Sequence, residues 1–152
     1  MAFSSALKGP ANITDNLKLW LKANAGVTGA TPVSAWTDQS GNGYNASVPA
    51  NGPDLLSNQL NFNPAFDFTS ASSEYMQITA GIMGATSFND AWTYVVSKTD
   101  IVQTQTMFYE ALAAGEAFDA LIPWSNSNIY YDFGTGRING AWGGSTATAA
   151  TI

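Results

Sequence analysis

Residues 38–43, with the sequence Asp-Gln-Ser-Gly-Asn-Gly, place oxygen-bearing side chains in a glycine-rich turn, and this chemistry suits a hard cation. Ca²⁺ binds about six to eight carboxylate, amide and carbonyl oxygens. Asp38 and Asn42 can supply two side-chain ligands and the carbonyls of residues 40–43 can add others, but a structural metal would need further ligands from elsewhere. The alternative is a metal-free turn, in which Asp38 accepts a local backbone hydrogen bond and Asn42 and Gly43 form a tight β-turn.

The last third of the chain collects aromatic and amide side chains of the kind that bind sugars. Carbohydrates are held by aromatic faces together with planar polar groups. The candidates for such a site are Trp124, Asn126, Asn128, Tyr130, Tyr131 and Trp142. In the alternative interpretation, the aromatic rings fill a protein core and its ends. Because neighbouring strand residues face opposite ways, Tyr130 and Tyr131 cannot both be buried, and one of them is expected at a surface or interface.

Acidic residues at Glu110, Glu116 and Asp119 raise the question of glycoside hydrolysis. Retaining hydrolases need two carboxyl groups on one face, about 5–5.5 Å apart. Glu116 and Asp119 are three positions apart, so on one strand they would face opposite ways. We therefore interpret these acids as solvated turn charges and predict that the chain is not an enzyme. The absence of histidine and cysteine also excludes His-dependent nucleophilic catalysis, thiolate metal sites and disulfides.

The composition limits the possible partners. The 152 residues suit one domain, and their formal net charge is −6. The five basic residues are scattered along the chain, which argues against nucleic acid as a partner. No segment approaches the roughly 20 apolar residues of a membrane span, and residues 1–10 do not match a signal peptide. The sequence thus predicts no direct membrane insertion, and either a cytoplasmic protein or one whose signal was removed.

Short alternating segments predict an all-β fold that would position these candidates. About ten strands with turns every 8–12 residues indicate an antiparallel β-sandwich, with residues 1–13 as an N-terminal extension and 14–152 as one domain. Phe62, Phe66 and Phe68 are core candidates. A short helix starting at Thr14 or Asp15 is the alternative for the first strand. The predicted strands are residues 17–22, 33–37, 60–63, 65–68, 75–78, 92–97, 106–109, 117–122, 129–133 and 137–142.

Residues 143–152 end on an apolar β-former and resemble the beginning of another strand. A sandwich that stopped there would expose a sheet edge. The sequence therefore predicts a sandwich that lacks its C-terminal strands, which a longer natural chain or a partner would supply.

Several blocks of this sequence resemble the concanavalin A-like, laminin G-like jelly-roll modules of large bacterial surface proteins, particularly those of Bacteroidetes. The blocks include Trp-Thr-Asp-Gln-Ser-Gly-Asn-Gly and the Pro-Trp-Ser turn, and they are residues 17–27, 36–43, 60–64, 73–78 and 121–134. The resemblance implies a jelly-roll fold, a module usually longer than this chain, and export in a long secreted protein, often by the type IX route. It also implies a Ca²⁺ site at the rim of the sandwich, to which Glu74 could contribute.

These observations together predict a non-catalytic extracellular module of a large secreted or cell-surface bacterial protein. Its roles would be adhesion, surface attachment or gliding-type motility. Its partners would be a surface polysaccharide or glycan, and neighbouring domains or a secretion or surface complex. The alternatives are a carbohydrate-binding lectin domain, a glucanase-like glycoside hydrolase, and a virion or filament subunit whose last strand a neighbour completes.

Overall fold

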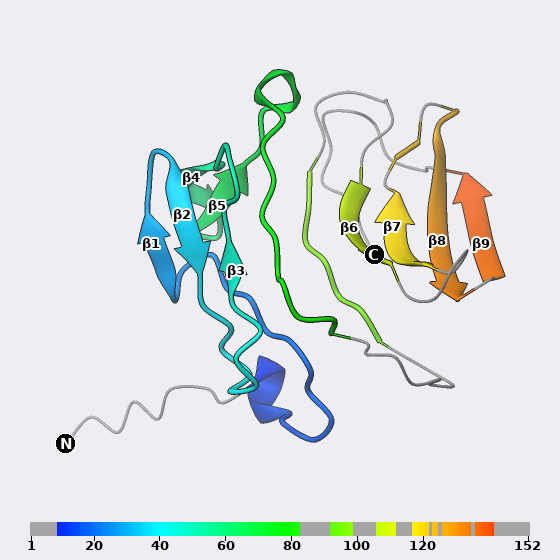
Figure 1. Cartoon of the computed structure of the whole chain (residues 1–152), viewed down its shortest axis with the longest axis horizontal. Coiled ribbons are helices and arrows are strands. Elements are labelled where there is room, and N and C mark those ends of the chain that lie inside the picture. Colours follow the sequence, from blue (N-terminus) through cyan, green and yellow to red (C-terminus); the bar gives the residue numbers. More distant parts are fainter. Residues whose placement is uncertain are drawn as a thin grey trace. The chain divides into compact units, whose positions relative to one another are not determined.

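The computed structural model describes residues 9–82, 92–98, 106–111, 117–121, 123–124, 126–134 and 136–141. The chain forms two compact units, Met1–Ile82 and Met83–Ile152, each of which we describe by itself. Every paired strand is antiparallel, and the helical elements of the described residues are the short 3-10 turns η1 (Pro10–Asn12) and η2 (Ser70–Ser72) (Figure 1). The fold is all-β and antiparallel, as the sequence predicts for a β-sandwich. The jelly-roll strand order and the single domain over residues 14–152 stay predictions.

The first unit contains a three-stranded sheet and a hairpin. The sheet has the order β1 (Val27–Gly29), β2 (Val33–Trp36) and β3 (Ala46–Ser47), and the hairpin joins β4 (Asp54–Leu60) to β5 (Asn63–Asp67) (Figure 1). The edge of Trp36 meets the ring of Phe66, with centroids 4.3 Å apart, and Phe66 in turn contacts Phe68 at 6.3 Å. The Trp36–Phe66 contact joins β2 to the hairpin, and the buried hydrophobic residues of this unit include Val33 and Ala46.

The prediction that Phe62 belongs to the core is wrong. Asn61 and Phe62 form the two-residue turn of the β4–β5 hairpin, with φ of 47° and 64°. Such a turn requires positive φ at both positions and directs its side chains away from the sheet. Phe62 is consequently 92% exposed. Phe66 is half-buried and Phe68 is exposed, so of the three predicted core residues only Phe66 lies well within the packing.

Residues 17–22, 75–78 and 92–97, all predicted as strands, do not form ladders. Isolated bridges join Lys22 to Ala25 and Ser47 to Gln77. Residues 92–98 form no paired strand with the described residues, although residues 94–98 alternate in exposure. An alternating pattern indicates which side of an extended segment is apolar, but it does not specify a hydrogen-bonding neighbour.

The second unit contains a four-stranded meander in which sequence neighbours pair. Its strands are β6 (Thr106–Ala111), β7 (Ala117–Leu121), β8 (Asn128–Gly134) and β9 (Gly136–Ala141) (Figure 1). These strands confirm the four sequence predictions in this region. On one face Phe118 contacts Phe108 and Tyr131, with ring centroids 5.1 and 5.9 Å apart. The opposite face, which we call the polar face, carries Tyr109, Asp119, Tyr130, Asp132 and Arg137.

In the part of the chain that the structure describes, no helix has the length and apolar character needed to cross a membrane.

Candidate functional site

Asp38 is buried at the start of the glycine-rich loop, with 7% of its surface exposed. Its Oδ1 accepts hydrogen bonds from the backbone N–H of Trp20 at 3.0 Å and of Ser40 at 2.8 Å. Its Oδ2 accepts one from the Ser40 hydroxyl at 2.7 Å and one from the Tyr44 N–H at 3.2 Å. A carboxylate offers about four lone-pair positions, so these donors use its accepting capacity fully.

The pKa of Asp38 reflects these donors. Burial by itself would raise the pKa, because it disfavours the charged form. The hydrogen bonds from the Ser40 side chain and from the three backbone amides outweigh burial, and they hold the pKa below its ordinary value. The carboxylate is therefore a stable anion that organises the surrounding backbone.

Asn42 extends the same network to the preceding segment. Its Nδ2 donates to the backbone carbonyls of Leu17 at 2.7 Å and Lys18 at 2.9 Å. The backbone N–H of Gln39 donates to the carbonyl of Trp20 at 2.8 Å. Side chains and loop backbone thus fasten residues 17–20 to the loop, which explains how this predicted strand is held without a ladder.

Glu74, the third candidate metal ligand, has a separate local role. Its Oε2 accepts a hydrogen bond of 2.7 Å from the backbone N–H of Thr69, which precedes η2. Across the described residues, no group of three or more His, Cys, Asp or Glu side chains is arranged to hold a metal ion. The hydrogen bonds of Asp38 and Asn42 agree with the metal-free alternative for the loop, and Ca²⁺ binding stays a prediction.

Four of the predicted sugar-binding residues lie together at the turn between β7 and β8. The rings of Trp124 and Tyr130 meet edge to face, with centroids 6.2 Å apart. Asn126 donates from Nδ2 to the Tyr130 hydroxyl at 2.7 Å, and its Oδ1 accepts a bond of 3.1 Å from the Asn128 N–H. The side-chain hydrogen bonds of Asn126 and Asn128 lower the pKa of Tyr130.

Tyr131 does not join this group. It packs against Phe118 on the opposite face of the sheet, so the prediction that Tyr130 and Tyr131 face opposite ways is confirmed. Trp142, the sixth candidate, lies outside the described residues.

A pair of buried aspartates on the polar face was missed by sequence reasoning. Asp119 of β7 lies directly opposite Asp132 of β8, and the two residues are 6% and 8% exposed. Arg137 of β9, opposite Asp132 in register, forms a two-pronged ion pair with both oxygens of that carboxylate. The guanidinium of Arg137 also lies over the Tyr130 ring, 5.1 Å from its centroid. The aspartate pair and the aromatic pair are therefore connected through Arg137.

The environments of the two aspartates push their pKa values apart. The hydrogen bonds from Arg137 lower the pKa of Asp132. Burial, and next the charge of Asp132, raise the pKa of Asp119, and Arg137 offsets this only in part. Asp119 Oδ1 is buried and has no hydrogen-bond partner in the part of the chain that the structure describes. A buried unpaired polar atom is unusual in a folded protein and marks a position that calls for an explanation.

The signal that could have revealed this pair is the turn at residues 125–128. Spacing along the chain relates Asp119 to the nearby acids Glu110 and Glu116, and not to an acid on a paired strand. Glu110 lies opposite Phe118 and so faces away from Asp119, and Glu116 lies outside the described residues. Folding the chain back at the predicted turn places Asp119 and Asp132 on the same sheet face, since the alternation continues across paired strands.

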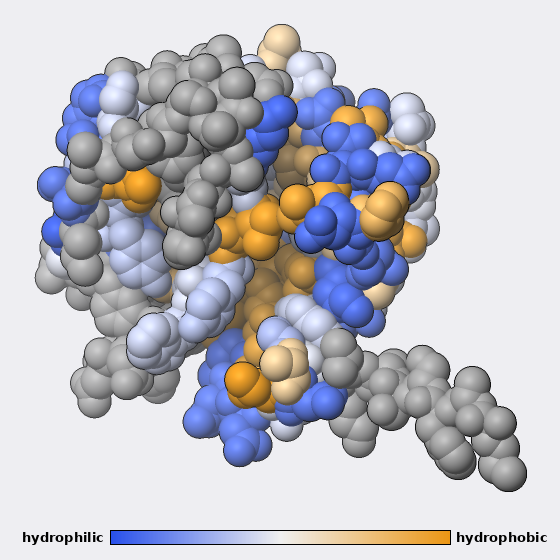
Figure 2. Space-filling model, turned by 180° about the vertical axis from the view of Figure 1, so that it is seen from behind, coloured by the Kyte–Doolittle hydropathy of each residue, from blue (hydrophilic) through white to orange (hydrophobic). Residues whose placement is uncertain are grey.

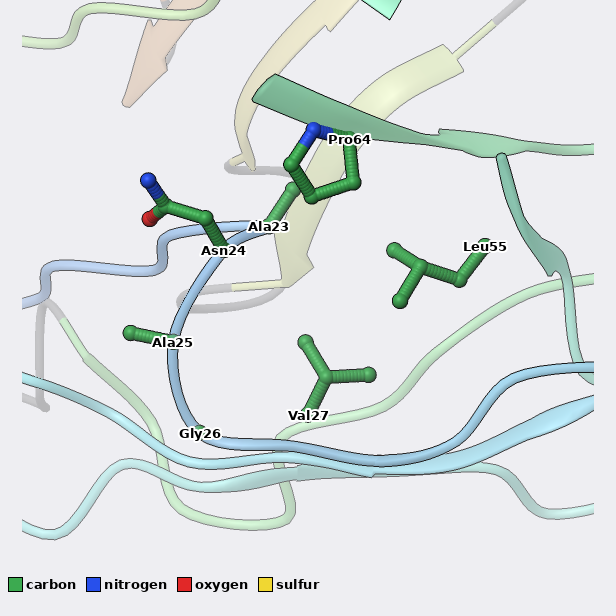
Figure 3. A pocket seen from close by; sticks show the side chains of 7 residues that line it. All are labelled: Ala23, Asn24, Ala25, Gly26, Val27, Leu55 and Pro64. Atoms are coloured by element: carbon green, nitrogen blue, oxygen red, sulfur yellow. The ribbon is translucent and has the colours of Figure 1, made fainter. Parts of the chain in front are cut away.

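The hollow shown in Figure 3 lies in the first unit and has a volume of about 290 Å³. The side chains of Val27, Leu55 and Pro64 point into it, whereas Asn24 points away (Figure 3). Its lining is residues 23–27, Leu55 and Pro64, none of which is titratable. With this small apolar lining, the hollow offers no chemistry beyond packing.

No protein-family model, curated protein or solved structure matches this chain. The fold and the polar face are therefore the basis for a functional proposal, and the resemblance to laminin G-like modules stays an expectation.

Proposed function

We propose that the chain is a non-catalytic extracellular attachment module of a bacterial surface protein, which holds a surface glycan on the polar face. The observation that carries this proposal is the cluster of Trp124, Asn126 and Arg137 around the side chain of Tyr130. It combines aromatic rings with an amide and a guanidinium, the groups that stack on sugar rings and bond to their hydroxyls. Adhesion or gliding-type motility would follow from glycan attachment.

The surface chemistry supports an attachment role. Only 11% of the residues are charged, while Asn, Ser and Thr are abundant. In Figure 2 hydrophilic residues cover much of the described surface on the face shown. A surface wetted by uncharged polar groups offers many partners for sugar hydroxyls.

The aspartate pair raises the alternative of a glycoside hydrolase. Directly opposite residues on paired strands have Cβ atoms about 4.5–5.5 Å apart, which approaches the spacing of a retaining enzyme. Both oxygens of Asp132 are bound to Arg137, however, so Asp132 cannot attack a sugar while that ion pair persists. This contact favours the non-catalytic proposal.

Binding to an array of bacterial polysaccharides and oligosaccharides tests the proposal. Replacing Trp124 by Ala removes the ring that contacts Tyr130, and we expect affinity for any bound glycan to fall at least tenfold. The matched control is Trp92→Ala, since Trp92 is 85% exposed and outside the cluster. Equal loss in both variants, or release of reducing sugar by the unmodified protein, would contradict a non-catalytic site on the polar face.

A further inference from the structure

Asp119 is the residue of the polar face whose carboxylate is incompletely hydrogen-bonded. It is 6% exposed, and its Oδ1 has no hydrogen-bond partner among the described residues, whereas both oxygens of Asp132 are bound to Arg137. A buried carboxylate oxygen without a donor lowers the stability of the fold. A partner that arrives from outside the chain accounts for such a group.

The charges around Asp119 define what that partner must carry. The residues in register with it are Tyr109 on β6 and Asp132 on β8, and Arg137 follows on β9. Among the described residues, Arg137 balances the charge of Asp132, so the charge of Asp119 is left uncompensated. An anion is therefore excluded as the partner, and a cationic hydrogen-bond donor is favoured.

A protonated amine fits this arrangement better than Ca²⁺. Ca²⁺ needs about six to eight oxygens, and Arg137 already occupies both oxygens of Asp132. An ammonium group carries one positive charge, which balances that of Asp119, and one of its three N–H groups can donate to the unpartnered Oδ1. Tyr109, directly opposite Asp119 in register, is 64% exposed, so rotation of its side chain can open a path to Asp119 while the Arg137–Asp132 ion pair stays in place.

We propose that the glycan held on the polar face contains amino sugars with a free amine, and that Asp119 receives the ammonium group while the Trp124–Tyr130 pair contacts the sugar ring. This inference rests on the proposed function, because it assigns the chemical class of the same glycan. Asp119 selects the amine by its charge, and the Trp124–Tyr130 pair selects the sugar ring by aromatic contact. These two parts of the polar face can be tested separately.

Calorimetric titration with glucosamine oligomers and with N-acetylglucosamine oligomers of equal length tests the inference, at a pH where the free amine is protonated. We expect the unmodified protein to bind the free-amine oligomer at least tenfold more tightly, since a hydrogen bond to a charged group contributes about this much. Asp119→Asn should abolish this preference and leave affinity for the acetylated oligomer within about twofold. Trp124→Ala should weaken binding of both oligomers.

Asp67→Asn is the matched control, because it removes the same charge from an exposed position on β5. If Asp67→Asn reduces the preference as much as Asp119→Asn, the attraction is that of a protein with net charge −6 for any cation, and the inference is overturned. Equal affinity of the unmodified protein for the two oligomers overturns the amine inference but leaves the proposed glycan site standing. Failure to bind any glycan overturns both. Circular dichroism establishes that each variant is folded.

Discussion

Asp38 and Asp119 are buried to nearly the same extent, 7% and 6% exposed, yet their surroundings treat the carboxylate charge in opposite ways. Asp38 accepts four hydrogen bonds, and its pKa is lowered despite burial. Asp119 has an oxygen that no described residue binds, and it has a neighbouring aspartate; its pKa is raised. The comparison teaches that the supply of local N–H and O–H donors, more than burial, decides whether a buried acid organises the fold or strains it.

Replacing Asp38 by Asn should give the largest effect, because it breaks hydrogen bonds of the aspartate whose two oxygens are both fully bonded. One side-chain oxygen becomes an NH₂ group that faces two N–H or O–H donors. We expect the free energy of unfolding to fall by about 3 kcal/mol, as typical when a buried hydrogen-bond network is broken. Urea unfolding followed by tryptophan fluorescence measures this change. The control variant is Asp54→Asn. A decrease below about 1 kcal/mol in the free energy of unfolding of Asp38→Asn, or an equal decrease in the control, would show that the four hydrogen bonds contribute little.

The same substitution at Asp119 should have the opposite sign. Asp119→Asn removes a buried charge that lacks a donor, and at neutral pH we expect a gain of about 1 kcal/mol in the free energy of unfolding. Thermal unfolding measures it as a higher Tm. A lower Tm would mean that ionised Asp119 has a stabilising partner. It would contradict our account that this carboxylate destabilises the fold whereas Asp38 stabilises it.

The pH dependence separates the two aspartates further. Because the pKa of Asp119 is raised above 3.8, its ionisation lowers stability as the pH rises from about that value through its folded-state pKa. The advantage of Asp119→Asn should therefore vanish below pH 3.8. The pKa of Asp38 is lowered, so its contribution is present above 3.8 and is lost as the pH falls through its folded-state pKa. An advantage of Asp119→Asn that does not change with pH would contradict this account.

The sequence predicts β6, β7, β8 and β9 well, because each has a period of two, but the same pattern at residues 92–97 does not give a strand paired with the described residues. It predicts Tyr130 and Tyr131 on opposite faces for the same reason. It fails at Phe62, where turn geometry overrides an alternating pattern, and at residues 17–22, where loop side chains replace a strand partner. Asp119 and Asp132 lie side by side because of the register between β7 and β8. Neither composition nor spacing along one strand specifies that register.

Asn42 gives the smallest expected effect and tests how far the order imposed by Asp38 extends. Asn42→Ala removes the Nδ2 donor that binds the carbonyls of Leu17 and Lys18. Because both carbonyls belong to exposed bonds that water can replace, we expect a loss of only about 0.5 kcal/mol. The loss should be concentrated in residues 17–20, with faster hydrogen exchange at the Trp20 amide, which donates to Asp38.

Gln59→Ala is the matched control for Asn42→Ala, since the Gln59 amide donates only to the nearby carbonyl of Ser57 among the described contacts. It should leave exchange at Trp20 unchanged. If Asn42→Ala also leaves it unchanged, Asp38 alone holds residues 17–20, and the glycine-rich loop acts through one carboxylate. If exchange accelerates, the Asn42 amide and the Asp38 carboxylate act together. The hydrogen bonds of Asp38 are then part of a network that spans the loop and the segment before it.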